Sequence, residues 1–107
     1  MNPQKREGNC YFIKSTDNKY VKIGVTNNLA ERFDNLQCGV PFNLEVVAIF
    51  PAKDMGALER FFHQEFRKYH IKGEWFYFKG DLKKYCEILP QEIKENVVEF
   101  GKANKNK

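Results

Sequence analysis

Four polar side chains are candidates for chemistry in this sequence: Tyr11, Lys22, Arg32 and Glu59. A phenol transfers protons, a carboxylate holds hard metal ions, and ammonium and guanidinium groups bind anions. The four residues are far apart along the chain, so they act together only if the fold gathers them. We therefore asked which elements carry them.

Two runs rich in β-forming residues, 10–15 and 20–25, flank the turn-forming residues 16–18. This pattern predicts two antiparallel strands joined by a short loop. Tyr11 lies in the first strand and Lys22 in the second. The loop length then decides whether their side chains share a face.

A loop over residues 16–19 places Tyr11 opposite Gly24 and Ile13 opposite Lys22, all on one face of the hairpin. That register brings the phenol close to the ammonium, whereas a loop one residue longer would separate them. Gly24 has no side chain, so we expect open space beside the Tyr11 ring, where a ligand approaches the backbone.

A capped helix follows the hairpin. Asn28 is a favourable N-cap, Glu31 stands three positions later as in a capping box, and Gly39 ends the helix. Arg32 lies within this helix. The residues that form its apolar face recur at helical spacing: Leu29, Phe33 and Leu36.

Residues 44–50 form a dense apolar run without strict alternation. Such a run is typical of the middle strand of a sheet that is covered on both faces, and helices must supply both covers. A second helix begins at Asp54. We expect its apolar side to contain Met55, Leu58, Phe61, Phe62, Phe66 and Tyr69.

Glu59 and His63 lie one helical turn apart, at the margin of that apolar side. Spacing alone gives equal weight to a surface glutamate beside a partly buried histidine and to a functional pair. No third ligand accompanies His63 and His70, so the pattern does not indicate a structural metal site.

An aromatic run over residues 73–78 predicts another strand. Glu74 within this run either lies at the edge of the core or contacts nucleic acid. An exposed ring of the run could also contact nucleic acid, because aromatic faces stack on unpaired bases. Asp81 is then predicted to cap a final helix, with Leu82, Tyr85, Ile88 and Leu89 facing inward. Pro90 interrupts this helix, and Ile93, Val97 and Phe100 resume its apolar spacing.

Composition predicts one basic, soluble domain. The chain has 107 residues, 18 Lys and Arg against 14 Asp and Glu, and a formal net charge of +4. An excess of basic residues favours a polyanionic partner, although many other proteins carry one. The polar residues 1–8 contain no leader-like apolar segment, and no apolar run is long enough to span a bilayer. We therefore expect a cytoplasmic protein.

The cysteines point to the same reducing compartment. Cys10, Cys38 and Cys86 are odd in number and widely spaced, with no C-x-x-C pair. This arrangement argues against a disulfide framework or a zinc site. Each is expected to be a small buried hydrophobic residue.

The candidate residues resemble the motifs of the GIY-YIG nuclease superfamily. Its first strand carries Gly-Ile-Tyr, the next strand Tyr-Ile-Gly, the next helix an arginine, and a later helix a glutamate. The matching positions are Asn9-Cys10-Tyr11, Lys22-Ile23-Gly24, Arg32 and Glu59. A Lys-Ile-Gly form, followed by the runs Arg32 to Gln37 and Gly73 to Phe76, resembles a phage and restriction-type branch.

The resemblance implies a fold and a set of boundaries. The expected fold is α/β (α+β), with a small, central, mainly antiparallel sheet of three to four strands flanked by helices. Residues 9–100 would form the single nuclease-like domain, preceded by a flexible N-terminus over 1–8 and followed by a basic flexible tail over 101–107.

It also implies a metal-dependent DNA endonuclease. Tyr11 would be the general base, with its pKa lowered by the Lys22 cation, and His63 would assist. Arg32 would hold the scissile phosphate, and Gly24 would admit the substrate. Glu59 would hold Mg²⁺ or Mn²⁺.

Two alternatives differ in their predictions. A noncatalytic nucleic-acid-binding module would keep the fold, with the altered first motif and Lys22 as signs of lost chemistry, and would bind DNA equally well in chelator. A protein-interaction domain would bind without the steep salt dependence that phosphate contacts cause. A nuclease without its own DNA-reading module would find its target through DNA structure, a partner protein or a homodimer.

Overall fold

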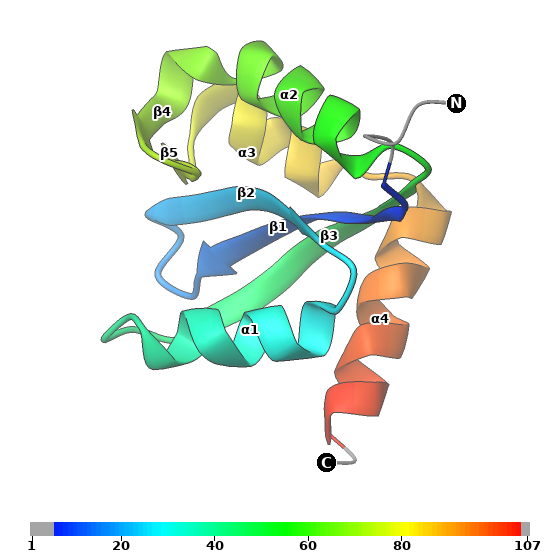
Figure 1. The fold of residues 1–107 in the computed structure, drawn as a ribbon. Helices are drawn as coiled ribbons and strands as arrows, with labels where there is room; N and C mark the ends of the chain where they lie inside the picture. The colour runs from blue at the N-terminus through cyan, green and yellow to red at the C-terminus, as the bar shows by residue number, and fades with distance from the viewer. Residues whose placement is uncertain (1–5, 106–107) are drawn as a thin grey trace.

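The computed structural model describes residues 6–105, which form an antiparallel sheet with helices on both faces (Figure 1). Its elements in chain order are β1 (Gly8–Ser15), β2 (Tyr20–Thr26), α1 (Leu29–Cys38), β3 (Leu44–Ala52), α2 (Met55–Glu65), the 3₁₀ helix η1 (Arg67–Tyr69), β4 (His70–Lys72), β5 (Trp75–Tyr77), α3 (Gly80–Glu87) and α4 (Gln91–Lys105). The mixed fold is as expected, but the sheet has five strands, in the order β3-β1-β2-β5-β4. The prediction of three to four strands was wrong.

The hairpin register is confirmed. Tyr11 pairs with Gly24 and Ile13 with Lys22 across β1 and β2. The loop is held by Ser15, whose hydroxyl donates a 2.6 Å hydrogen bond to Asp17 and accepts a 3.1 Å bond from the Tyr20 amide. These bonds fix the loop length, and the loop length fixes which side chains share a face.

The two faces of the sheet have separate cores. On one face Phe12 lies among four rings of β3, α2 and α3, with centroid distances of 4.9 Å to Phe62 and 5.5 Å to Phe50. On the other face Tyr11 and Ile13 pack with the apolar side of α1, which is the predicted one. The Asn28 cap is also confirmed, because its side chain accepts a hydrogen bond from the Glu31 amide.

β3 is an edge strand, so its prediction as a middle strand was wrong. The apolar run reflects burial from both faces and not a central position, because its residues enter both cores. α4 packs along β3, and Asn96 donates a 3.2 Å hydrogen bond to the Ile49 carbonyl (Figure 1).

The additional strand comes from residues that carry no strand signal. β4 is short and fully exposed, and it joins β5 through Gly73, whose φ of 57° favours glycine. His70 donates a 2.8 Å hydrogen bond from Nε2 to the Gly73 carbonyl, which closes the turn. The strand predicted over 73–78 is therefore β5, and it begins only at Trp75.

Several predictions near the ends of elements were wrong. Lys79, and not Asp81, is the N-cap residue of α3. Phe61 is 57% exposed and Ile88 is 70% exposed, so neither faces the core, and Tyr69 lies in η1 beyond α2. Cys38 is exposed, whereas Cys10 and Cys86 are buried and all three are free.

The predicted terminal segments also differ from the structure. Gly8 already belongs to β1, and the Arg6 carbonyl accepts a 2.9 Å hydrogen bond from the Met55 amide. α4 continues to Lys105, so the predicted flexible tail is helical over residues 101–105. Residues 1–5 and 106–107 lie outside the described part. Within residues 6–105, each helix is too short or too polar to span a bilayer.

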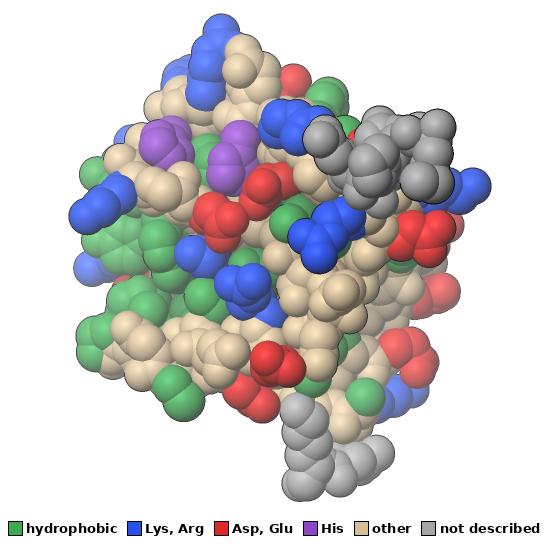
Figure 2. Space-filling model, viewed as in Figure 1, with side chains coloured by type: hydrophobic (Ala, Val, Ile, Leu, Met, Phe, Trp, Pro, Cys, Tyr) green, Lys and Arg blue, Asp and Glu red, His purple; other side chains and the backbone are tan. Residues whose placement is uncertain are grey.

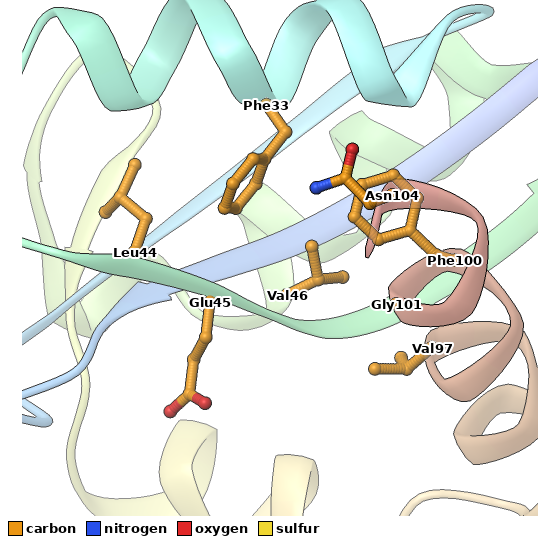
Figure 3. A pocket seen from close by; sticks show the side chains of 8 residues that line it. All are labelled: Phe33, Leu44, Glu45, Val46, Val97, Phe100, Gly101 and Asn104. Atoms are coloured by element: carbon orange, nitrogen blue, oxygen red, sulfur yellow. The ribbon is translucent and has the colours of Figure 1, made fainter. Parts of the chain in front are cut away.

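An apolar hollow of about 460 Å³ lies between α1, β3 and α4. Figure 3 shows Phe33 of α1 above Leu44 and Val46 of β3, with Phe100 of α4 beside them. The Phe33 and Phe100 rings lie 6.0 Å apart. The hollow lies over the edge strand β3, which β1 separates from Lys22 and Gly24 on β2.

We expect Phe12→Ala to lower the free energy of unfolding by about 3–5 kcal/mol, because the fully buried ring lies among aromatic side chains. Phe61→Ala is the control and should change it by less than about 0.5 kcal/mol, because this ring is mostly exposed. Urea denaturation of both variants measures the difference. Equal losses would show that the core is not centred on Phe12.

Candidate active site

Tyr11 lies directly across Gly24. A Cβ atom at Gly24 would lie 2.7 Å from Tyr11 Cζ and 2.7 Å from Glu74 Oε1. The expectation of open space beside the ring was therefore wrong, since the phenol and a carboxylate fill it. Glycine is required here because any side chain would displace these groups.

Glu74 is the site residue whose role the sequence left undecided. It lies just before β5, and its backbone carbonyl accepts a 3.0 Å hydrogen bond from the Ile23 amide of β2. This bond extends the β2–β5 ladder by one position and carries the Glu74 carboxylate to Gly24. The sequence signal for Glu74 was its position in the Gly-Glu-Trp-Phe run, where an acidic residue has no evident role in local structure.

Glu59 of α2 lies beside Glu74. Burial raises the pKa of the Glu59 carboxyl to about 7, and a hydrogen bond with Glu74 and the negative charge of Glu74 act in the same direction. The Glu59 Oε2 atom is buried and has no hydrogen-bond partner among the described residues. The two carboxyls therefore lie next to each other at a partly buried position.

Lys22 pairs with Glu74 at an Nζ to Oε1 distance of 3.5 Å. Its ammonium also lies 5.2 Å from the centroid of the Trp75 ring. The Lys22 side chain is 14% exposed, and its pairing partner on β5 is Trp75. The cation expected to act on Tyr11 is thus paired with a carboxylate beside it.

The Tyr11 hydroxyl is buried and, within residues 6–105, has no hydrogen-bond partner. Burial raises the pKa of Tyr11 well above its ordinary value, and the charges of Glu74 and Glu59 raise it further. The charge of Arg32 lowers it. We expected Lys22 to lower the pKa of Tyr11. In the structure the cation that lowers it is Arg32, and the pKa is nevertheless raised.

Arg32 is exposed on α1. It lines a polar hollow of about 400 Å³ with side chains from the end of β2, the β2–α1 connection and α1: Thr26, Asn27, Asn28, Glu31 and Asn35. Exposure and polar neighbours leave its guanidinium accessible to an anion.

His63 lies nearby but is engaged with the backbone. Its Nε2 donates a 2.8 Å hydrogen bond to the Ile23 carbonyl, and its ring packs edge-on against Phe76 at 5.0 Å. A nitrogen that donates to a carbonyl cannot accept a proton, so the structure gives this nitrogen a positioning role between α2 and β2.

The site lies on β2, where α1 and α2 approach the sheet from opposite sides (Figure 1). Figure 2 shows acidic, basic and histidine side chains gathered on this face. Tyr11, Lys22, Gly24, Glu59 and Arg32 are thus near one another, as predicted. Glu74 completes the group.

The family model for the T5orf172 domain matches residues 8–99, which is most of the chain. The chain belongs to the T5orf172 domain family. No match was found among the curated proteins or the solved structures compared with it. The boundaries of the match agree with the span from β1 through most of α4.

The oxygen donors of this T5orf172 domain fit a hard divalent cation. Glu59 and Glu74 supply carboxylates, and both Glu59 Oε2 and the Tyr11 hydroxyl are buried without a hydrogen-bond partner in the described part of the chain. Mg²⁺ is commonly held by one or two carboxylates and fills its other positions with water and phosphate oxygens. Residues 6–105 contain no cluster of three or more His, Cys, Asp or Glu around one point, so an all-protein cage is not formed.

Glu59→Gln should remove a pH-dependent loss of stability from this T5orf172 domain. Since folding raises the pKa of Glu59 from 4.5 to about 7, the folded state keeps this proton while the unfolded state releases it. The free energy of unfolding of the wild type should fall, relative to Glu59→Gln, between pH 4.5 and pH 7. We expect a loss of about 1 kcal/mol, because solvent screens this partly exposed group.

Chemical denaturation at several pH values without divalent ions measures this loss. Glu65→Gln, at an exposed position of the same helix, is the control and should follow the wild-type pH dependence. Parallel pH curves for Glu59→Gln and the wild type would contradict a raised pKa at Glu59.

Proposed function

We propose that this chain is a metal-dependent DNA endonuclease of the GIY-YIG type, which hydrolyses phosphodiester bonds. The observation that carries the proposal is that Tyr11 and Glu74 meet above Gly24, with Glu59 and Lys22 beside Glu74 and the charge of Arg32 acting on Tyr11. The elements that meet there are remote in sequence, and the group combines a phenol, two acids and two cations.

Glu59 and Glu74 would hold Mg²⁺ or Mn²⁺. The bound ion would neutralise their charges and stabilise negative charge on the phosphate. A carboxyl with a pKa of about 7 must lose its proton before it binds a cation, so Glu59 ties cation affinity to pH. We expect affinity and activity to rise as the pH passes through about 7.

Tyr11 would act as the base. Its phenolate would accept a proton from water while the water oxygen bonds to phosphorus and the bond from phosphorus to the departing deoxyribose oxygen breaks, that oxygen taking a proton from solvent. The charges of Glu59 and Glu74 oppose this phenolate, so neutralising them favours the base.

Arg32 and Lys22 would have different tasks. Arg32 is exposed and forked, which suits paired hydrogen bonds to the nonbridging phosphate oxygens. Lys22 is mostly buried and holds Glu74 at 3.5 Å, which suits the positioning of a carboxylate. His63 would keep α2, and with it Glu59, against β2 through its bond to Ile23.

A noncatalytic DNA-binding module is the second candidate. The observation that favours it is the buried Tyr11 hydroxyl, whose raised pKa opposes ionisation. Such a module would bind DNA through Arg32 and the surrounding cations without needing Glu59. A single nuclease site cuts one strand, so a double-strand break would need a homodimer, a partner protein or two successive encounters.

Nicking of supercoiled plasmid in Mg²⁺ or Mn²⁺ tests the nuclease. We expect Glu59→Ala and Tyr11→Phe each to lower the nicking rate by at least about a hundredfold, since each removes a group used in the chemical step. Glu65→Ala and Tyr85→Phe are matched controls that lie away from the site and should retain activity.

The same reaction in chelator separates the candidates. Loss of nicking in chelator and in both site variants would support the nuclease. Metal-independent DNA binding that is unchanged in Glu59→Ala, without nicking of plasmid or of flapped duplexes, would support the noncatalytic module.

Calorimetric titration with Mn²⁺ tests the acidic pair without relying on cleavage. We expect Glu59→Gln and Glu74→Gln each to weaken Mn²⁺ binding at least about tenfold, because each removes one ionised ligand. Wild-type affinity should fall when the pH is lowered from 8 to about 6, below the Glu59 pKa of about 7. Unchanged affinity in Glu74→Gln would leave Glu59 as the sole protein ligand.

A further inference from the structure

One part of the α1 face of the sheet is not covered by a helix. α1 packs over β1 and β3, whereas β5 and β4 lie beyond β2 and away from α1 (Figure 1). Four aromatic side chains lie along this uncovered part: Tyr20, Phe42, Trp75 and Tyr77. We call them the aromatic row.

The strand register sets the order of the row. Tyr20 pairs with Tyr77, and Lys22 pairs with Trp75, across β2 and β5. The four paired residues, Lys22 included, therefore share the face that carries Tyr11 and Gly24. The row begins beside the candidate active site and runs away from it toward the β1–β2 loop.

The rings are in contact but incompletely buried. Tyr20 lies 6.3 Å from both Phe42 and Tyr77, and Phe42 lies 6.4 Å from Trp75. Tyr77 is 46% exposed, and the other three rings are partly exposed. Figure 2 shows hydrophobic side chains gathered at the left of this face, next to basic ones.

Basic groups accompany the row. The Lys22 ammonium lies 5.2 Å from the Trp75 ring centroid, and the Lys79 ammonium lies 5.3 Å from that of Tyr77. Lys72 on β4 is exposed and is the pairing partner of Trp75. Rings with lysines beside them suit a ligand that has flat apolar faces and repeated negative charges.

We propose that the aromatic row binds unpaired bases of the DNA strand that is cut at the candidate active site. Bases in a duplex are already stacked on one another, so their faces are available to protein rings only where the strand is unpaired. The exposed Lys72 and Lys79 would contact the phosphates between those bases. The preferred substrate would then be a flap, overhang or branch, with its single-stranded segment next to the scissile phosphate.

This inference rests on the proposed function for the location of cleavage, but base stacking can be measured without it. Trp75 is the one tryptophan of the chain, so its fluorescence reports directly on the row. The protein would be titrated in chelator with short oligothymidylate, with an abasic oligonucleotide of equal length and with a blunt duplex. The abasic strand keeps the phosphates and lacks the bases.

We expect oligothymidylate to quench Trp75 and to bind at least about tenfold more tightly than the abasic strand. Tyr77→Ala and Tyr77→Leu should each weaken oligothymidylate binding about tenfold and leave abasic binding unchanged, while Tyr77→Phe keeps wild-type affinity. The leucine variant retains an apolar side chain if alanine disturbs the fold. Phe61→Ala, an exposed ring on the opposite side of the sheet, should bind like the wild type.

Equal affinity for the three ligands, with no effect of Tyr77→Leu, would overturn the proposal. So would self-association that Tyr77→Leu abolishes while DNA binding is unchanged, because the row would then be a contact between copies. Quenching without cleavage would support the row and count against the nuclease. Cleavage of blunt duplex without any quenching would support the nuclease and exclude the row.

Discussion

The arrangement of the site depends on the contact between Tyr11 and Gly24 across β1 and β2. Because the glycine has no side chain, the phenol ring lies over its backbone, and the Glu74 carboxylate lies over the same atom. This close approach places the Glu74 carboxylate where Glu59 of α2 interacts with it. A shift of the hairpin by one residue would turn Tyr11 toward the other core and dissolve the group.

Without a bound ligand, the negative charges of the two acids in the site are largely compensated. Lys22 neutralises Glu74, and Glu59 retains a proton up to a pH of about 7, so little net charge is buried. The arrangement follows from the cost of burying two like charges together. In the proposed nuclease, a divalent cation would displace this proton, and the added positive charge would favour ionisation of Tyr11.

Local patterns in the sequence predicted the elements that local interactions determine. Loop length and alternation gave the β1–β2 register, and capping residues gave the starts of α1 and α2. The failures concern tertiary context. An apolar run cannot distinguish a central strand from an edge strand that α4 covers, and the exposed residues of β4 show no alternating apolar pattern that would mark a strand.

The site residues also divide into those that the sequence pattern predicted and those that depend on tertiary context. The motif residues came together as predicted, whereas Glu74 and the engagement of His63 required the positions of β5 and α2. Single side chains that the helical period placed inward, such as Phe61 and Ile88, are exposed because no element lies over them. The helical tail of α4 follows from its apolar residues, which pack on the α1 face through Val97 and Phe100.

The register that builds the site also links it to the uncovered surface. Lys22 of β2 pairs with Ile13 of β1, on the face that carries Tyr11, and on its other side it pairs with Trp75 of β5. One lysine therefore contacts both the acidic pair, through Glu74, and the first ring of the aromatic row. A domain built only for duplex DNA would have no use for exposed rings beside its acids, since the flat faces of paired bases are inaccessible. The neighbouring position of the two features favours a substrate whose strand leaves the duplex where it enters the site.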